Sequence, residues 1–314
     1  MPIGLVNKSF STGNSDEKRG TKNSSIGIGG VSPLTLYQLV DSCVPSGGFA
    51  HSNTLEAAHQ LHFLNLTKSS WRVSLREHCF DVLLQTFTTT VPFIVEACDL
   101  FRLHYHNHGQ KLHNDIKETL PPPPEDVLLK WERLDMELRA TMNSHVACRA
   151  STTQGSGMLR AFSAAFPNIS PVIKVLRRRI IKMMPIQVSQ ADSSGHAATC
   201  FGAVCGLLDI NNETCVSMFL YTTARDMVNA AVRMNLIGPL EGGCVTNELC
   251  SGVNKLIEMF LDMIIQSCRD EDDSQVTSGK GTTTASTNIG HQVAPLVEVL
   301  SNAHDRLYTR LFNS

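Results

Sequence analysis

The chain has 314 residues, enough for one large domain or two small ones, and 42% of them are hydrophobic, which supports a packed core. Its formal net charge of −2 excludes a broad nucleic-acid-binding surface, because phosphate contacts need a clear excess of lysine and arginine. No apolar run reaches the roughly 18 to 20 residues that cross a bilayer. We therefore expect a protein that binds neither nucleic acid nor a membrane.

The first segment, residues 1–32, predicts a disordered leader because it is rich in Ser, Asn, Gly and Lys. It lacks the long apolar core of a secretory signal. The ten cysteines of the chain are scattered, without a CxxC pair, and most lie in apolar helical patterns. This usage favours buried free thiols in a reducing compartment, so we expect a cytoplasmic location.

Residues 45–52, with the sequence PSGGFAHS, interrupt two apolar helical faces, one over residues 34–43 and one that begins at Leu55. We call these eight residues the corner. Pro45 disfavours continuation of the first helix, and Gly47 and Gly48 permit backbone angles that a side chain would penalise. Two interpretations are open: a helix-turn-helix connection with Phe49 buried in the core, or a shaped surface that a partner recognises.

The dominant period along the rest of the chain is helical, with apolar residues at every third or fourth position. Such stretches begin at Trp71, after Pro92 and at Val127, and they recur over residues 197–208, 218–236 and 253–265. Residues 197–208 are almost wholly small and apolar and predict a central buried helix. No convincing alternation suggests a sheet. We predict a single all-α domain over residues 33–268, a helical bundle of about eight to ten helices.

Three segments fall outside this pattern. Residues 121–124 are four prolines and predict a stiff connector. Residues 269–290 carry acids followed by Ser, Thr and Gly, and predict a flexible linker. Residues 291–314 predict a C-terminal helix and a tail.

The tail, residues 303–314, carries Leu307, Tyr308, Leu311 and Phe312. Burial of these four side chains contributes about 6 to 12 kcal/mol gross, whereas ordering a dozen residues costs about 12 to 24 kcal/mol. The tail therefore needs a surface to lie on, either its own core or another protein.

Few residues suggest chemistry. His104, His106 and His108 form an H-x-H-x-H run in which the first and third share a helical face, a weak candidate for metal binding. The chain lacks a P-loop, a local nucleophile signature and paired carboxylates. These features by themselves predict a helical scaffold, a binding protein.

Five stretches, in order, resemble the urease accessory protein F family. They are LYQLVDS at 36–42 with the corner and Leu55-Glu56; Leu134-Asp135 with RAS at 149–151 and Gln154-Gly155; His196 with Phe201-Gly202; NAAVRM at 229–234 with IGPL at 237–240; and HDRLYTRLFNS at 304–314. The chain departs from the family at Asn53-Thr54, where a glycine usually precedes Leu-Glu.

The resemblance implies an all-α protein that dimerises and takes part in urease maturation. It also implies that the protein is not itself an enzyme, and we expect no tightly bound cofactor. In the family, such a protein binds a second accessory protein, called D or H, and the pair recruits a nickel-carrying GTPase, accessory protein G. The assembly then delivers nickel to apo-urease, so the complex handles the metal. The family's C-terminal tail becomes ordered on the D/H partner.

We accordingly predict one set of partner-binding residues in the corner and the tail, and another that faces the GTPase. They are Tyr37, Pro45, Gly47, Gly48, Phe49, His51, Glu56, Arg225, Arg233, His304, Arg306, Tyr308, Arg310, Leu311 and Phe312. Tyr37, Arg225 and Arg233 are the GTPase-facing candidates, although Arg233 could instead cap or pair within its own helix. Alternative functions are a direct nickel-binding metallochaperone, a GTPase-regulating adaptor with a client other than urease, and a thiol or serine enzyme.

Overall fold

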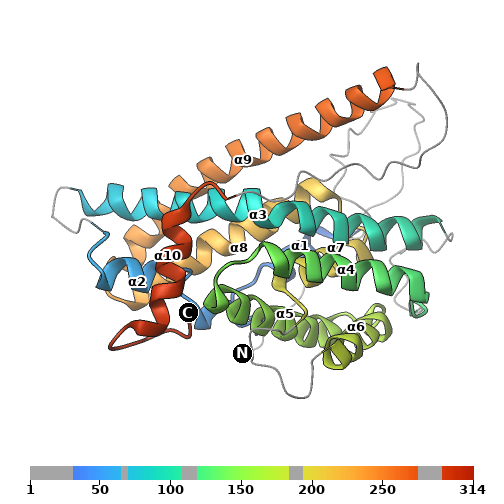
Figure 1. The fold of residues 1–314 in the computed structure, drawn as a ribbon, viewed down its shortest axis with the longest axis horizontal. Coiled ribbons are helices and arrows are strands. Elements are labelled where there is room, and N and C mark those ends of the chain that lie inside the picture. Colours follow the sequence, from blue (N-terminus) through green and yellow to red (C-terminus); the bar gives the residue numbers. More distant parts are fainter. Residues whose placement is uncertain (1–30, 65–69, 108–118, 184–193, 275–291) are drawn as a thin grey trace, which may run out of the picture.

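The structure is a computed structural model that describes residues 31–64, 70–107, 119–183, 194–274 and 292–314 (Figure 1). These residues form ten α-helices and no β-strand, which confirms the predicted all-α fold and the predicted number of helices. Residues 1–30 of the predicted leader and residues 275–290 of the predicted linker lie outside the described residues.

Several elements follow one another directly or after short connections, whereas longer segments separate α3 from α4, α6 from α7 and α9 from α10. Their bounds are α1 Pro33–Leu39, η1 Gly48–Ala50, α2 Leu55–Gln60, α3 Trp71–Asn107, α4 Glu125–Thr141, α5 His145–Ala165, α6 Ser170–Met183, α7 Ala197–Leu207, α8 Asn212–Arg233, α9 Pro239–Ser274, α10 Pro295–Ala303 and η3 His304–Arg306.

Helix α7 is the centre of the bundle, as its small apolar sequence predicts. All eleven of its residues are buried, and it packs on α3 and α5. Gly202 and Gly206 allow the close approach: a Cβ at Gly202 would lie 2.3 Å from the Ile94 carbonyl oxygen, and one at Gly206 would lie 2.2 Å from that of Cys98. The two glycines therefore set the distance between α7 and α3.

Helix α3 joins the two apolar stretches on either side of Pro92 into one helix of 37 residues. A proline inside a helix removes one backbone hydrogen bond and crowds the preceding turn. Here the helix continues because residues on both sides of Pro92 are buried in the same core, among them Leu83, Ile94 and Phe101.

Two predicted boundaries differ from the structure. Helix α1 ends at Leu39, and Cys43 is exposed beyond it, so the first apolar face is shorter than expected. Helix α9 continues to Ser274, six residues past the predicted end of the domain at Cys268. The acidic residues at 270–273 are thus helical, since the stretch contains neither the glycine nor the proline that commonly ends a helix. In Figure 1 this end of α9 extends away from the other helices.

Helix α10 brings the chain back onto the bundle, where it contacts α2, α3 and α5. The tail follows it and returns toward the corner near α2 (Figure 1). None of the helices in the described ranges combines the length and apolar character of a membrane span.

Candidate functional site

The corner is built by its two glycines. Gly47 has a φ of +87°, a left-handed conformation that favours glycine. Gly48 is buried against α8, where a Cβ would lie 2.2 Å from Oδ2 of Asp226. The predicted role in backbone geometry is confirmed for Gly47, whereas Gly48 is needed for the space it leaves to Asp226. A buried Phe49 is wrong: its side chain is 67% exposed, because the turn directs Gly48 inward in its place.

Asn53 and Thr54, which stand where the family usually has a glycine before Leu-Glu, lie directly after the corner and have an unusual backbone conformation. Both residues have positive φ, 50° at Asn53 and 73° at Thr54, and these are backbone angles that glycine adopts with less strain. The buried Thr54 hydroxyl lies 3.1 Å from Nε2 of His78. The chain thus keeps a glycine-like backbone here and places a polar side chain against α3.

Arg233, the last residue of α8, joins the corner to the tail. Its guanidinium carbon lies 3.6 Å from the centre of the Phe49 ring and 4.4 Å from that of Phe312. The same guanidinium donates a hydrogen bond to the Phe49 carbonyl oxygen. Arg233 is therefore placed by residues far from it in sequence.

Glu56 holds the tail from the first turn of α2. This carboxylate is only 3% exposed. It accepts hydrogen bonds from the backbone amides of Leu311, at 2.6 Å, and Phe312, at 3.1 Å. Nε2 of His304 lies 3.0 Å from its second oxygen. Gln60, one turn later, donates to the Thr309 carbonyl at 2.8 Å.

The last residues of the tail pair with the backbone of the corner. The Asn313 amide donates to the Ala50 carbonyl at 2.8 Å, and the Ser52 amide donates to the Ser314 carbonyl at 2.7 Å. Nδ1 of His51 lies 2.6 Å from the Ser314 hydroxyl. Burial, together with the charges of His304 and Arg149, lowers the pKa of His51 to about 4.

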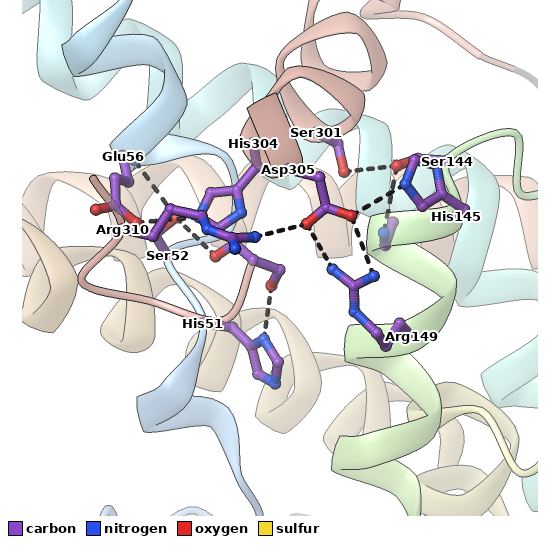
Figure 2. Close-up of polar contacts among 12 residues, drawn as sticks. His51, Ser52, Glu56, Ser144, His145, Arg149, Ser301, His304, Asp305 and Arg310 are labelled. Carbon is purple, nitrogen blue, oxygen red and sulfur yellow. Dashed lines mark hydrogen bonds and ion pairs between the residues drawn. The ribbon is translucent and has the colours of Figure 1, made fainter. Parts of the chain in front are cut away.

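Asp305 ties the tail to α5 (Figure 2). Its carboxylate accepts two hydrogen bonds from Arg149, at 2.8 and 3.1 Å, and lies 3.1 Å from Nε2 of His145. Arg310 donates to it at 3.1 Å from within the tail. The hydrogen bonds from Arg149 are the main reason that the pKa of Asp305 lies below its usual value.

The structure thus brings most of the predicted tail and corner residues to one place. Pro45, Phe49, Arg306, Tyr308, Arg310 and Leu311 are exposed there, whereas Gly48, His51, Glu56, His304 and Phe312 are buried.

The predicted GTPase-facing residues are not brought together as one exposed group. Tyr37 on α1 is 69% exposed. Arg225 is mostly buried, pairs with Asp226 and donates to the Val40 carbonyl oxygen, so it holds the segment after α1 against α8.

The predicted histidine run does not form a metal site in the part of the chain that the structure describes. His104 lies edge-on to the Tyr105 ring, at 4.8 Å between centroids, and His106 is exposed. His108 lies outside the described residues. Within those residues, no three His, Cys, Asp or Glu side chains are arranged to hold a metal ion.

Sequence reasoning did not assign a role to Asp305, Arg149 or Ser52, although these residues fasten the tail. Asp305 is a charged residue in an otherwise apolar and basic segment, which is a signal that an internal cation partner exists. The backbone bonds of Ser52 have no comparable signal, because they depend on how the corner is folded.

Comparisons with known proteins relate the chain to urease accessory proteins. The family model UreF matches residues 72–250. The chain is 28% identical over 278 residues to urease accessory protein F of Arabidopsis thaliana, covering 88% of this chain and 91% of the relative. It is 24% identical over 319 residues to urease accessory protein 6 of Cryptococcus neoformans var. grubii, covering 89% and 96%.

The family match extends over more than half of the chain, from the start of α3 into α9. The alignments with the relatives are longer than this match, and each spans close to nine-tenths of the chain. UreF proteins are accessory proteins rather than enzymes, and this chain, too, is not an enzyme. The chain is therefore a member of the UreF family.

Proposed function

We propose that this chain is a urease accessory protein that acts as a scaffold in nickel delivery to apo-urease. In this role it binds a D/H accessory protein, and the pair recruits a nickel-carrying GTPase in the cytoplasm. One observation carries the proposal: the family-like motifs at the two ends of the chain, the corner and the tail, meet in a single site through Glu56, Ser52 and Arg233.

The site has the composition of a binding surface. Arginine and aromatic residues are enriched where interfaces gain most of their binding energy, and Arg306, Tyr308 and Arg310 are all exposed along the tail. Nickel is the cargo of the assembly in this proposal, and the GTPase carries it. The chain itself acts as a homodimer that orients its partners.

Deletion of residues 303–314 tests the proposal. We expect the truncated chain to lose co-purification with the D/H partner and, with it, the GTPase. The helical circular-dichroism signal should stay nearly unchanged, because the deletion removes only the last residue of α10 and the short η3. Retained binding of the D/H partner by the truncated chain would contradict the assignment.

A matched control is replacement of Arg306 and Arg310 by lysine in the full-length chain. Lysine keeps the charge of the tail but lacks the planar guanidinium that pairs with carboxylates through two donors. We expect an intermediate loss of binding, which would show that the deletion acts through the tail's own side chains.

A further inference from the structure

We propose that the outward face of α6 is a docking surface for a short acidic segment of another protein, in which carboxylates flank an apolar residue. The face consists of Lys174, Arg178, Ile181 and Lys182, and we call it the basic face. Helix α6 lies at the other end of the bundle from α2 and α10 (Figure 1). The basic face is therefore distinct from the site at which the corner and the tail meet.

Charge is distributed unevenly along the sequence. Residues 138–191 contain eight Lys and Arg residues and no Asp or Glu, whereas the rest of the chain has 19 Lys and Arg against 29 Asp and Glu. This cationic segment includes α5 and α6. The small net charge of the whole chain thus results from two regions of opposite charge, and a charge asymmetry of this kind indicates an interaction surface.

Helix α6 has one buried and one exposed side. The side that packs on α5 and the core is apolar and consists of Val172, Ile173, Leu176 and Ile180. The three cations of the basic face are exposed and occupy every fourth position from Lys174 to Lys182, and Ile181 is 67% exposed beside them. Because positions four apart are neighbours on a helix, the three cations form one row.

The cations of the basic face differ in their pairing from the arginine that faces the neighbouring helix. Arg179 forms ion pairs with Glu125 and Glu132 of α4, the latter at 3.3 Å. Among the residues that the structure describes, no carboxylate forms an ion pair with a cation of the basic face. Like charges four residues apart destabilise a helix. Carboxylates of a bound partner would offset this repulsion, which no described residue of the chain does.

Carboxylates of a peptide segment fit the basic face better than the phosphates of RNA or of a membrane. Ile181 gains nothing from a sugar-phosphate backbone, but it can bury an apolar side chain of a peptide. Insertion into a membrane needs a larger apolar face than one isoleucine. A long polyanion would also meet the acidic remainder of the chain, whereas a short segment interacts mainly with charges within a Debye length, about 8 Å at physiological ionic strength.

The first test measures, by fluorescence anisotropy, how the full-length chain binds a labelled synthetic peptide in which glutamates flank leucines. We expect Arg178→Glu to weaken binding about fivefold or more, because it replaces an attractive charge by a repulsive one. Lys255→Glu makes the same change of charge at an exposed position of α9, and this matched control should bind normally. Equal binding by the two variants, or no binding by the wild type, would overturn the proposal.

The stability of the variants separates docking from a structural role. Arg178→Glu places a carboxylate four residues from both Lys174 and Lys182, so it converts two repulsions within α6 into attractions. We therefore expect the variant to be at least as stable as the wild type in urea unfolding. Lys182→Glu is a second variant and should weaken peptide binding in the same way. Weaker binding only in variants that are also less stable would overturn the docking role.

The second test identifies the class of partner. We expect Ile181→Ser to weaken binding of the glutamate-leucine peptide but not of polyglutamate, because only the first supplies an apolar side chain. Equal effects on both peptides would overturn the apolar part of the proposal. Single-stranded RNA and phosphatidylserine vesicles are measured in parallel, and tighter binding of either one, lost in Arg178→Glu, would overturn the assignment to carboxylates. Neither test uses the D/H partner, so the results are independent of the proposed function.

Discussion

His51 and His78 are buried histidines that flank the segment linking the corner to α2. His51 contacts Ser314 of the tail, and His78 on α3 contacts Thr54. Burial is the largest cause that lowers both pKa values from 6.5 to about 4. Each imidazole is therefore neutral in the folded protein over most of the acidic range.

Because of these two histidines, we expect the free energy of unfolding to fall on mild acidification. Above about pH 6.5 both rings are neutral in the folded and unfolded states and have no effect on the pH dependence. Between about pH 6.5 and 4 the unfolded chain binds protons that the folded chain does not. The free energy of unfolding should then fall by up to about 1.4 kcal/mol per pH unit for each histidine.

Chemical denaturation of His78→Gln at a series of pH values checks this. Glutamine can still hydrogen-bond Thr54 but does not titrate, so the dependence between pH 6.5 and 4 should become less steep. The control is His106→Gln, at an exposed position of the same helix. An unchanged slope in His78→Gln would show that His78 is not responsible.

At the scale of helices, the contact between α3 and α7 depends on the absence of two side chains. Gly→Ala inside a helix normally stabilises it by about 0.5 to 1 kcal/mol. At Gly202 and Gly206 the new Cβ would overlap carbonyl oxygens of α3, and backbone cannot move aside as a flexible side chain can. Gly202→Ala and Gly206→Ala should therefore destabilise the protein by about 1 to 3 kcal/mol or more, as measured by thermal or urea unfolding.

Gly243→Ala in α9 is the matched control for this pair. A Cβ added at Gly243 would meet no heavy atom within 4 Å, and the residue is exposed. The normal helical preference should apply there, and the variant should be slightly more stable than the wild type. Destabilisation of similar size at all three glycines would refute a role of close helix contact.

At the scale of the whole molecule, local pattern and long-range structure were predictable to different degrees. The apolar residues at every third or fourth position predicted the long helices, because a helix with one buried face has this spacing. The almost wholly apolar composition of residues 197–208 predicted the burial of α7. The continuation of α9 past Cys268 was not predicted, since the acidic composition of residues 270–273 suggested a linker although no stop signal precedes them. The exposure of Phe49 depends on the turn at Gly47, which selects the residue that faces α8.

The tail is the clearest case of what sequence reasoning leaves open. Its composition indicated that it needs a surface, but the two choices, its own core or a partner, have the same local signature. The contact between Glu56 and Phe312 joins residues 256 positions apart. Only the packing of α10 on α2 and α5 brings them together. The spacing of apolar residues within one helix does not indicate which other helices it packs against.

Replacement of Arg233 tests whether the corner and the tail, which are far apart in sequence, are coupled. It contacts Phe49 of the corner and Phe312 of the tail. Each cation–π contact is worth about 0.5 to 1 kcal/mol at an exposed site. Arg233→Ala should therefore lower stability by about 1 to 2 kcal/mol and raise hydrogen exchange in the corner and at Phe312 together. Arg233→Lys should recover little, because lysine lacks the planar group that stacks on both rings.

Arg160→Ala, at an exposed position on α5, is the control. Faster exchange in only one of the two segments would mean that Arg233 does not couple them, and a change in GTPase recruitment by Arg233→Ala would then reflect direct contact.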